Sequence, residues 1–159
     1  MRSVALLLCL LALVAEADER ILRFHSTIEI GADGWLTVTE ETTVQAEGNR
    51  IRRGIYRDFP TNYTDRYGNT VEVDYDPLSV LRNDAREHFF SEQLRNGQRT
   101  YFGNTDRLLD NGEHRYVFRY RAHRLLGFFE NHDELYWDVT GLDWDFPIES
   151  ASAAIHLEF

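Results

Sequence analysis

Four arginines lie close together in residues 49–60, and they are the strongest candidates for chemistry in this sequence. Guanidinium groups bind carboxylate, phosphate or sulfate through paired hydrogen bonds. Arg52, Arg53 and Arg57 could therefore hold an anion. The alternative is that the arginines pair with acids of the same domain. We expect internal pairing, because residues 125–159 contain eight acids and no arginine, and on this hypothesis the substitution Arg53→Ala destabilises the fold.

Acidic side chains in the last third of the chain are the second candidate. Asp133 and Glu134, together with Asp143 and Asp145, could supply the paired carboxylates of a hydrolase. Closely spaced oxygen ligands could also bind calcium, but the central glycine and terminal glutamate of the twelve-residue calcium loop are missing. We keep a carboxylate-pair hydrolase as an alternative function, and we expect no metal ion and no cofactor.

Aromatic residues, which make up 13% of the sequence, are the third candidate. Tyr116, Phe118 and Tyr120 alternate along one predicted strand, so we expect them to face a core. Trp144 lies between two aspartates, and we expect it near the surface. An exposed ring of this kind can stack on a sugar or contact a protein partner. Together with the arginine cluster, it keeps a glycan- or anion-binding module open as another alternative.

Charge and motif content exclude several classes of function. All 17 basic residues are arginines, against 27 acids, and the formal net charge of −10 argues against a nucleic-acid partner, which requires a surplus of basic charge. The single cysteine, Cys9, excludes a disulfide scaffold and a zinc site built from cysteines. The sequence contains no His-Glu-x-x-His, Gly-x-Ser-x-Gly, Gly-x-Gly-x-x-Gly or P-loop motif.

A secretory signal peptide is predicted at residues 1–17. Arg2 precedes a nearly unbroken apolar run over residues 3–14, and residues 15–17 have the small-x-small form that signal peptidase accepts. A stable membrane-spanning helix needs roughly 20 apolar residues, so this run is too short to be one. We expect cleavage at the end of this segment, which leaves a domain of residues 18–159.

The rest of the chain alternates between apolar and polar residues with a period of two, which is typical of half-buried strands. In residues 22–30 the even positions, Leu22 among them, form the expected buried face. Asp33 and Gly34 then predict a hairpin turn into a second β-branched run over residues 36–44.

Turn residues separate the other strand candidates. These are residues 71–75, 78–82, 88–93, 99–102, 115–123, 135–140 and 153–159. Only residues 105–109 could form a helical turn. Strands at a spacing of about 8–12 residues predict one all-β domain, an antiparallel β-sandwich of immunoglobulin-like or related type.

Three segments resemble the N-terminal region of a family of predicted membrane proteins, the domain of unknown function 2207 or YciQ-like family. They are residues 52–60, which read Arg-Arg-Gly-Ile-Tyr-Arg-Asp-Phe-Pro, residues 125–140 and residues 144–148. The hairpin over residues 28–40 fits as well, and the resemblance extends over residues 20–159.

This resemblance implies an extracytoplasmic β-rich domain, followed by transmembrane helices beyond residue 159 that tether it. It supplies no activity and no catalytic residues. We therefore expect a non-catalytic interaction or sensing domain of a bacterial membrane protein, located on the periplasmic or external face of the membrane. Its expected partner is a protein or another component of the cell envelope.

Overall fold

The computed structural model describes residues 18–64, 68–141 and 144–158. The predicted signal peptide lies outside these residues, as does Asp143. The strands are β1 (Arg20–Ile30), β2 (Leu36–Ala46), β3 (Gly54–Phe59), β4 (Asn62–Thr64), β5 (Thr70–Glu72), β6 (Asp74–Arg82), β7 (Ala85–Arg86), β8 (Phe89–Leu94), β9 (Gly97–Gly103), β10 (Gly112–His123), β11 (Leu126–Phe128), β12 (Asp133–Leu135) and β13 (Ala151–Leu157). The predicted all-β class is confirmed.

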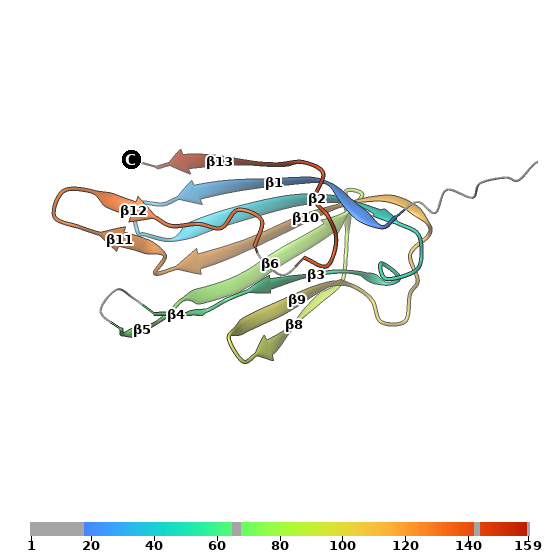
Figure 1. Ribbon diagram of the computed structural model, residues 1–159, viewed down its shortest axis with the longest axis horizontal. Helices are drawn as coiled ribbons and strands as arrows, with labels where there is room; N and C mark the ends of the chain where they lie inside the picture. The colour runs from blue at the N-terminus through green and yellow to red at the C-terminus, as the bar shows by residue number, and fades with distance from the viewer. Residues whose placement is uncertain (1–17, 65–67, 142–143, 159) are drawn as a thin grey trace, which may run out of the picture.

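Two sheets form the body of the domain (Figure 1). The larger has the strand order β13-β1-β2-β10-β6-β7, and the smaller has the order β3-β9-β8. Two short hairpins, β11–β12 and β4–β5, project at one end of the molecule. The strand pairs are antiparallel except for β13, which runs parallel to β1 at the edge of the large sheet. This arrangement confirms the predicted single-domain sandwich. None of the described residues forms a helix that could cross a membrane.

The period-two pattern of the sequence explains which faces are buried. Every second residue of β2 and β10 is buried, because one face of each strand packs against the small sheet while the other meets solvent. In β1 the register shifts between Ile21 and Arg23, so Ile21 is buried and Leu22 is only half-buried. The inward position predicted for Leu22 is wrong, because a register irregularity moves a side chain to the other face. Residues 105–109 form no helix.

Aromatic rings join the two sheets in the core. Phe102 of β9 packs against Phe118 of β10 with 4.7 Å between ring centroids, and Phe59 of β3 meets Tyr120 edge-on at 5.6 Å. Tyr116, Phe118 and Tyr120 are all buried, as their alternation predicted.

A pair of glycines fixes the start of β3 against the end of β9. Gly54 and Gly103 are register partners, with φ angles of 140° and 137°. A Cβ atom on Gly54 would lie 1.7 Å from the carbonyl oxygen of Phe102, and one on Gly103 would lie 2.0 Å from that of Arg53. The chain that leads into β3 can therefore approach β9 this closely only because neither residue has a side chain.

We expect Gly54→Ala to lower the free energy of unfolding by about 3 kcal/mol or more, because the new methyl group collides with backbone that cannot move away. Urea denaturation measures this change. The matched control is Gly68→Ala, which also has a positive φ but no atom within 4 Å of the added Cβ. Equal losses in the two variants would contradict the close approach as the cause.

Candidate functional site

A buried ion pair connects the two sheets. Arg57 of β3 faces inward, and its guanidinium donates through Nε and Nη2 to the two carboxylate oxygens of Glu40 on β2, at 2.9 and 3.1 Å. The hydroxyl of Tyr120 donates to the same carboxylate at 2.8 Å. Burial alone would lower the pKa of Arg57, but the Glu40 carboxylate outweighs this effect and raises it. Burial also raises the pKa of Tyr120, and the charge of Glu40 raises it further.

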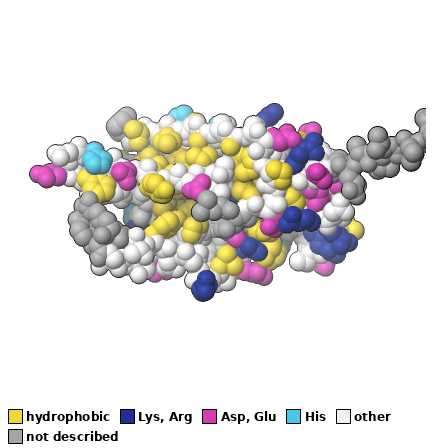
Figure 2. All heavy atoms as spheres, viewed as in Figure 1, with side chains coloured by type: hydrophobic (Ala, Val, Ile, Leu, Met, Phe, Trp, Pro, Cys, Tyr) yellow, Lys and Arg dark blue, Asp and Glu magenta, His cyan; other side chains and the backbone are white. Residues whose placement is uncertain are grey.

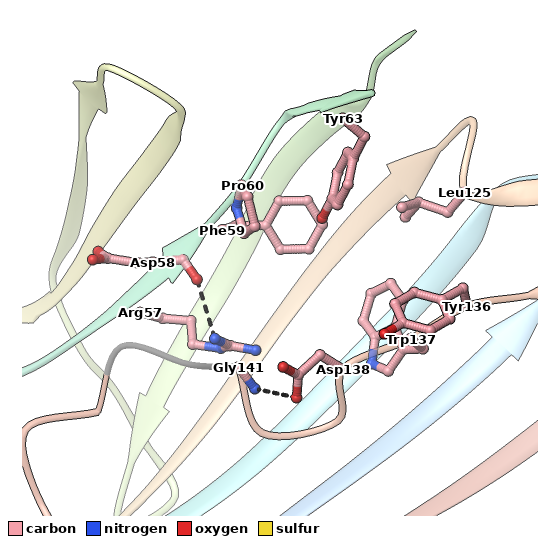
Figure 3. A pocket seen from close by; sticks show the side chains of 10 residues that line it. All are labelled: Arg57, Asp58, Phe59, Pro60, Tyr63, Leu125, Tyr136, Trp137, Asp138 and Gly141. Carbon is pink, nitrogen blue, oxygen red and sulfur yellow. Dashed lines mark hydrogen bonds between the residues drawn. The ribbon is translucent and has the colours of Figure 1, made fainter. Parts of the chain in front are cut away.

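The end of Arg57 forms part of an aromatic pocket of about 230 Å³ (Figure 3). Figure 3 shows the rings of Phe59 and Tyr63 on one side and those of Tyr136 and Trp137 on the other. The pocket is lined by Arg57, Asp58, Phe59, Pro60, Tyr63, Leu125, Tyr136, Trp137, Asp138 and Gly141. Tyr136 is 85% exposed and Tyr63 40% exposed, so aromatic surface is open to a ligand.

The polar groups of this aromatic pocket are mostly occupied within the fold. Arg57 Nη1 donates to the carbonyl oxygen of Asp58 at 3.1 Å, and Asp138 accepts a hydrogen bond from the amide of Gly141 at 3.1 Å. The indole nitrogen of Trp137 is buried and has no hydrogen-bond partner among the described residues. Burial raises the pKa of Tyr63, with the Arg57 charge lowering it in part and Asp138 raising it. The pocket thus combines exposed rings with polar groups that are largely engaged within the fold.

Arg52 and Arg53 lie elsewhere, in the loop that precedes β3. Both side chains are exposed, and neither forms an ion pair with any residue in the described part of the chain. They line a second hollow of about 350 Å³, here called the arginine cleft, together with Arg50. The structure therefore separates the predicted arginine cluster into one buried residue and an exposed group.

Glu19 holds the loop that carries these arginines. Its carboxylate accepts hydrogen bonds from the backbone amides of Glu47, Asn49, Arg50 and Ile51 at 2.6 to 3.1 Å. Burial would raise the pKa of Glu19, but the four amide donors outweigh it and lower the pKa. Sequence reasoning missed Glu19, because neither its type nor its spacing links it to a loop about thirty residues away.

The acidic residues of the tail do not gather into one site. Asp145 pairs with Arg50 at 3.0 Å and accepts a hydrogen bond from the hydroxyl of Tyr56, also at 3.0 Å. Asp133 and Glu134 are exposed on β12, in the hairpin at the other end of the molecule (Figure 1). The structure thus separates this pair from Asp145, and it brings no three potential metal ligands together among the residues it describes.

The predicted internal pairing is confirmed for Arg50 and Arg57, although Arg57 pairs with Glu40 rather than with a tail acid. It is not found for Arg52 and Arg53 in the described structure, so the expectation that Arg53→Ala destabilises the fold loses its basis.

Trp144 contributes to the core as well as to the surface. Its ring meets Phe24 edge-on at 6.2 Å, and its indole N–H donates to the carbonyl oxygen of Thr140 at 2.7 Å. Sequence reasoning placed it near the surface because of the flanking aspartates. The ring is in fact partly buried, because the tail folds back across β1.

Residues 20–158 match the family of predicted membrane proteins called DUF2207, in its N-terminal domain. The chain belongs to this family. A relative from Escherichia coli K12, the uncharacterized protein YciQ, is 27% identical over 131 residues. That match covers 82% of this chain and 21% of YciQ, so the chain spans about a fifth of this relative.

Solved structures give only distant likenesses to this DUF2207 domain. Native leukotriene A4 hydrolase from Saccharomyces cerevisiae has 14% sequence identity and a TM-score of 0.47, over 65% of this chain and 15% of that one. An M1 zinc metallopeptidase from Deinococcus radiodurans has 15% identity and a TM-score of 0.44, over 70% and 22% of the two chains. Similarities at this level do not bear on function.

We expect Glu40→Gln to lower the free energy of unfolding by about 3 kcal/mol or more, because it leaves the buried Arg57 charge without a counter-charge. Replacing both partners, in Glu40→Leu/Arg57→Met, should recover part of that loss. The control Arg53→Ala removes an exposed arginine and should stay within about 0.5 kcal/mol of the parent. Chemical denaturation of the variants checks this, and a neutral Glu40→Gln would contradict it.

We call the hydrogen bonds from four backbone amides to the Glu19 carboxylate the Glu19 cap, and we expect these bonds to break in acid. Because the folded pKa is lowered, its contribution to stability is fully present above the unfolded pKa of about 4.3 and is lost as the pH falls through the folded value. NMR titration should show the amides of Asn49, Arg50 and Ile51 shifting together with a midpoint below about pH 4.3. The same common titration in Glu19→Gln would show that another acid is responsible.

Proposed function

We propose that this domain binds a component of the cell envelope for a membrane protein, on the extracytoplasmic side, and that its role is recognition or sensing rather than catalysis. Membership of a family of predicted membrane proteins supports the first part. The observation that carries the proposal is the aromatic pocket at the end of β3, in which Tyr63 and Tyr136 present exposed ring surface beside the buried ion pair.

The engagement of the polar groups in the aromatic pocket favours recognition over catalysis. A general acid or base needs a titratable group within hydrogen-bond reach of the substrate and free to exchange its proton. Arg57 is fixed by Glu40 and by a backbone carbonyl, and Asp138 caps the turn at Gly141. A carboxylate-pair hydrolase built on Asp133 or Glu134 with Asp145 has no support in the geometry, because these residues lie on separate parts of the molecule.

The chemistry of the aromatic pocket fits a sugar unit of an envelope glycan. A sugar ring has an apolar face that can lie against an aromatic side chain, and a rim of hydroxyl groups that require hydrogen-bond partners. The rings on the two sides of the pocket supply the first contact. The exposed carboxylate of Asp138 supplies an acceptor for the second.

We expect Tyr136→Ala to weaken the binding of oligosaccharide probes by about tenfold or more, because it removes the most exposed ring of the pocket. Oligomers of N-acetylglucosamine and of glucose serve as probes, and tryptophan fluorescence and NMR report binding. The control is Phe128→Ala, which removes a ring that is 73% exposed outside the pocket. Failure of every probe to bind, equal losses in the two variants, or cleavage of a bound probe would overturn the proposal.

A further inference from the structure

We propose that the arginine cleft at the start of β3 is a separate binding site for phosphate groups, with Arg52 and Arg53 as its main ligands. This site does not depend on the function proposed above, because the cleft and the aromatic pocket have no lining residue in common.

The positive charge of the arginine cleft is only partly compensated within the described residues. Arg50, Arg52 and Arg53 line it, and the described residues that line it include no acid. Arg50 is paired with Asp145, but Arg52 and Arg53 have no ion-pair partner within residues 18–64, 68–141 and 144–158. Figure 2 shows basic side chains gathered at this end of the molecule, with some acidic side chains among them. The two unpaired guanidinium groups leave a positive site that a bound anion would neutralise.

The backbone that carries these arginines is held in place before any ligand binds. The Glu19 carboxylate fixes the amides of residues 47 and 49–51, and the carbonyl oxygen of Arg52 accepts a hydrogen bond from the amide of Leu109 at 2.8 Å. Directly after Arg53, the contact between Gly54 and Gly103 fixes the chain against β9. A fixed backbone lowers the entropy cost of bringing guanidinium groups together around one anion.

The remaining lining residues suit a phosphate ester better than a bare ion. Phe90 and Tyr101 stack at 4.8 Å in the wall of the cleft and offer apolar surface to the organic part of an ester. Asn104 and Thr105 add polar side chains. The side-chain oxygen Oδ1 of Asn104 accepts a hydrogen bond from the backbone amide of Asp106 at 2.8 Å, which leaves the side-chain nitrogen as a donor.

The number of donors favours phosphate over carboxylate. The guanidinium groups of Arg52 and Arg53 and the side-chain amide of Asn104 present more N–H donors than the two oxygens of one carboxylate can accept. A phosphate monoester has three terminal oxygens, and Arg is well suited to bind them in pairs. Two sources carry a phosphate monoester in a cell envelope, namely the headgroup of a monoester phospholipid such as phosphatidic acid and a soluble phosphate ester.

Binding of glycerol 3-phosphate, with glycerol as the uncharged control, tests the site by calorimetry and NMR. Co-sedimentation with vesicles of phosphatidic acid in phosphatidylcholine, against vesicles of phosphatidylcholine alone, tests the lipid source. We expect Arg52→Ala/Arg53→Ala to weaken binding by about tenfold or more. The control Arg95→Ala/Arg119→Ala removes the same charge from two exposed arginines outside the cleft, and it should weaken binding by less than about twofold.

Binding of glycerol 3-phosphate alone would assign the site to a non-lipid phosphate, and arginine-dependent vesicle binding would assign it to a headgroup. Absence of binding to both probes, or equal losses in the two double variants, would overturn the proposal. The variant Arg52→Lys/Arg53→Lys keeps the charge but removes the paired donors. Affinity equal to that of the parent would also overturn a site built on guanidinium forks. Thermal unfolding of each variant verifies that the fold is intact.

Discussion

The buried pair of Glu40 and Arg57 is the interaction on which the rest of this domain depends. Removing two charges from water is costly, and the cost is offset only when geometry and hydrogen bonds are nearly complete. Here the guanidinium meets both carboxylate oxygens, the hydroxyl of Tyr120 adds a third contact, and a backbone carbonyl takes a further N–H. Because Glu40 belongs to the large sheet and Arg57 to the small one, these contacts are satisfied only when the two layers are aligned as they are. The pair thus constrains how the two sheets are aligned.

The ion pair fixes β3, whose two ends lie at the aromatic pocket and at the arginine cleft. Inward positions of β3 alternate with outward ones, where Asp58 binds Arg99 at 2.6 Å and Tyr56 lies under the same guanidinium at 3.8 Å. Both faces of this short strand are therefore held by ion pairs. Its last residues form one wall of the aromatic pocket, and the residues just before it form the arginine cleft. The strand β3 thus contributes residues to both hollows, and other segments complete each of them.

The sequence predicted the architecture well because strand periodicity is a local property. It placed Tyr116, Phe118 and Tyr120 in the core, and the same reasoning could have separated Arg57 from Arg53. Arg57 lies between two apolar inward residues of β3, whereas Arg53 precedes the strand. The sequence did not identify Glu40 as the partner of Arg57, since contact between β2 and β3 depends on how the two sheets pack. The Glu19 cap and the irregularity at Leu22 were missed for a similar reason, because both depend on partners distant in sequence.

The net charge of −10 is compatible with a positive site, because screening makes electrostatics local. At physiological ionic strength the interaction between exposed charges decays over about 8 Å. Asp133 and Glu134, on the hairpin at the far end of the sandwich, contribute little to the potential at the arginine cleft. Two tail acids of the described residues are already engaged, Asp145 by Arg50 and Glu149 by Arg20. Arg52 and Arg53 therefore experience mainly their immediate surroundings. The Glu19 carboxylate keeps its negative charge while it accepts hydrogen bonds from backbone amides, so at this loop two guanidinium groups without an ion-pair partner in the described structure stand against one carboxylate.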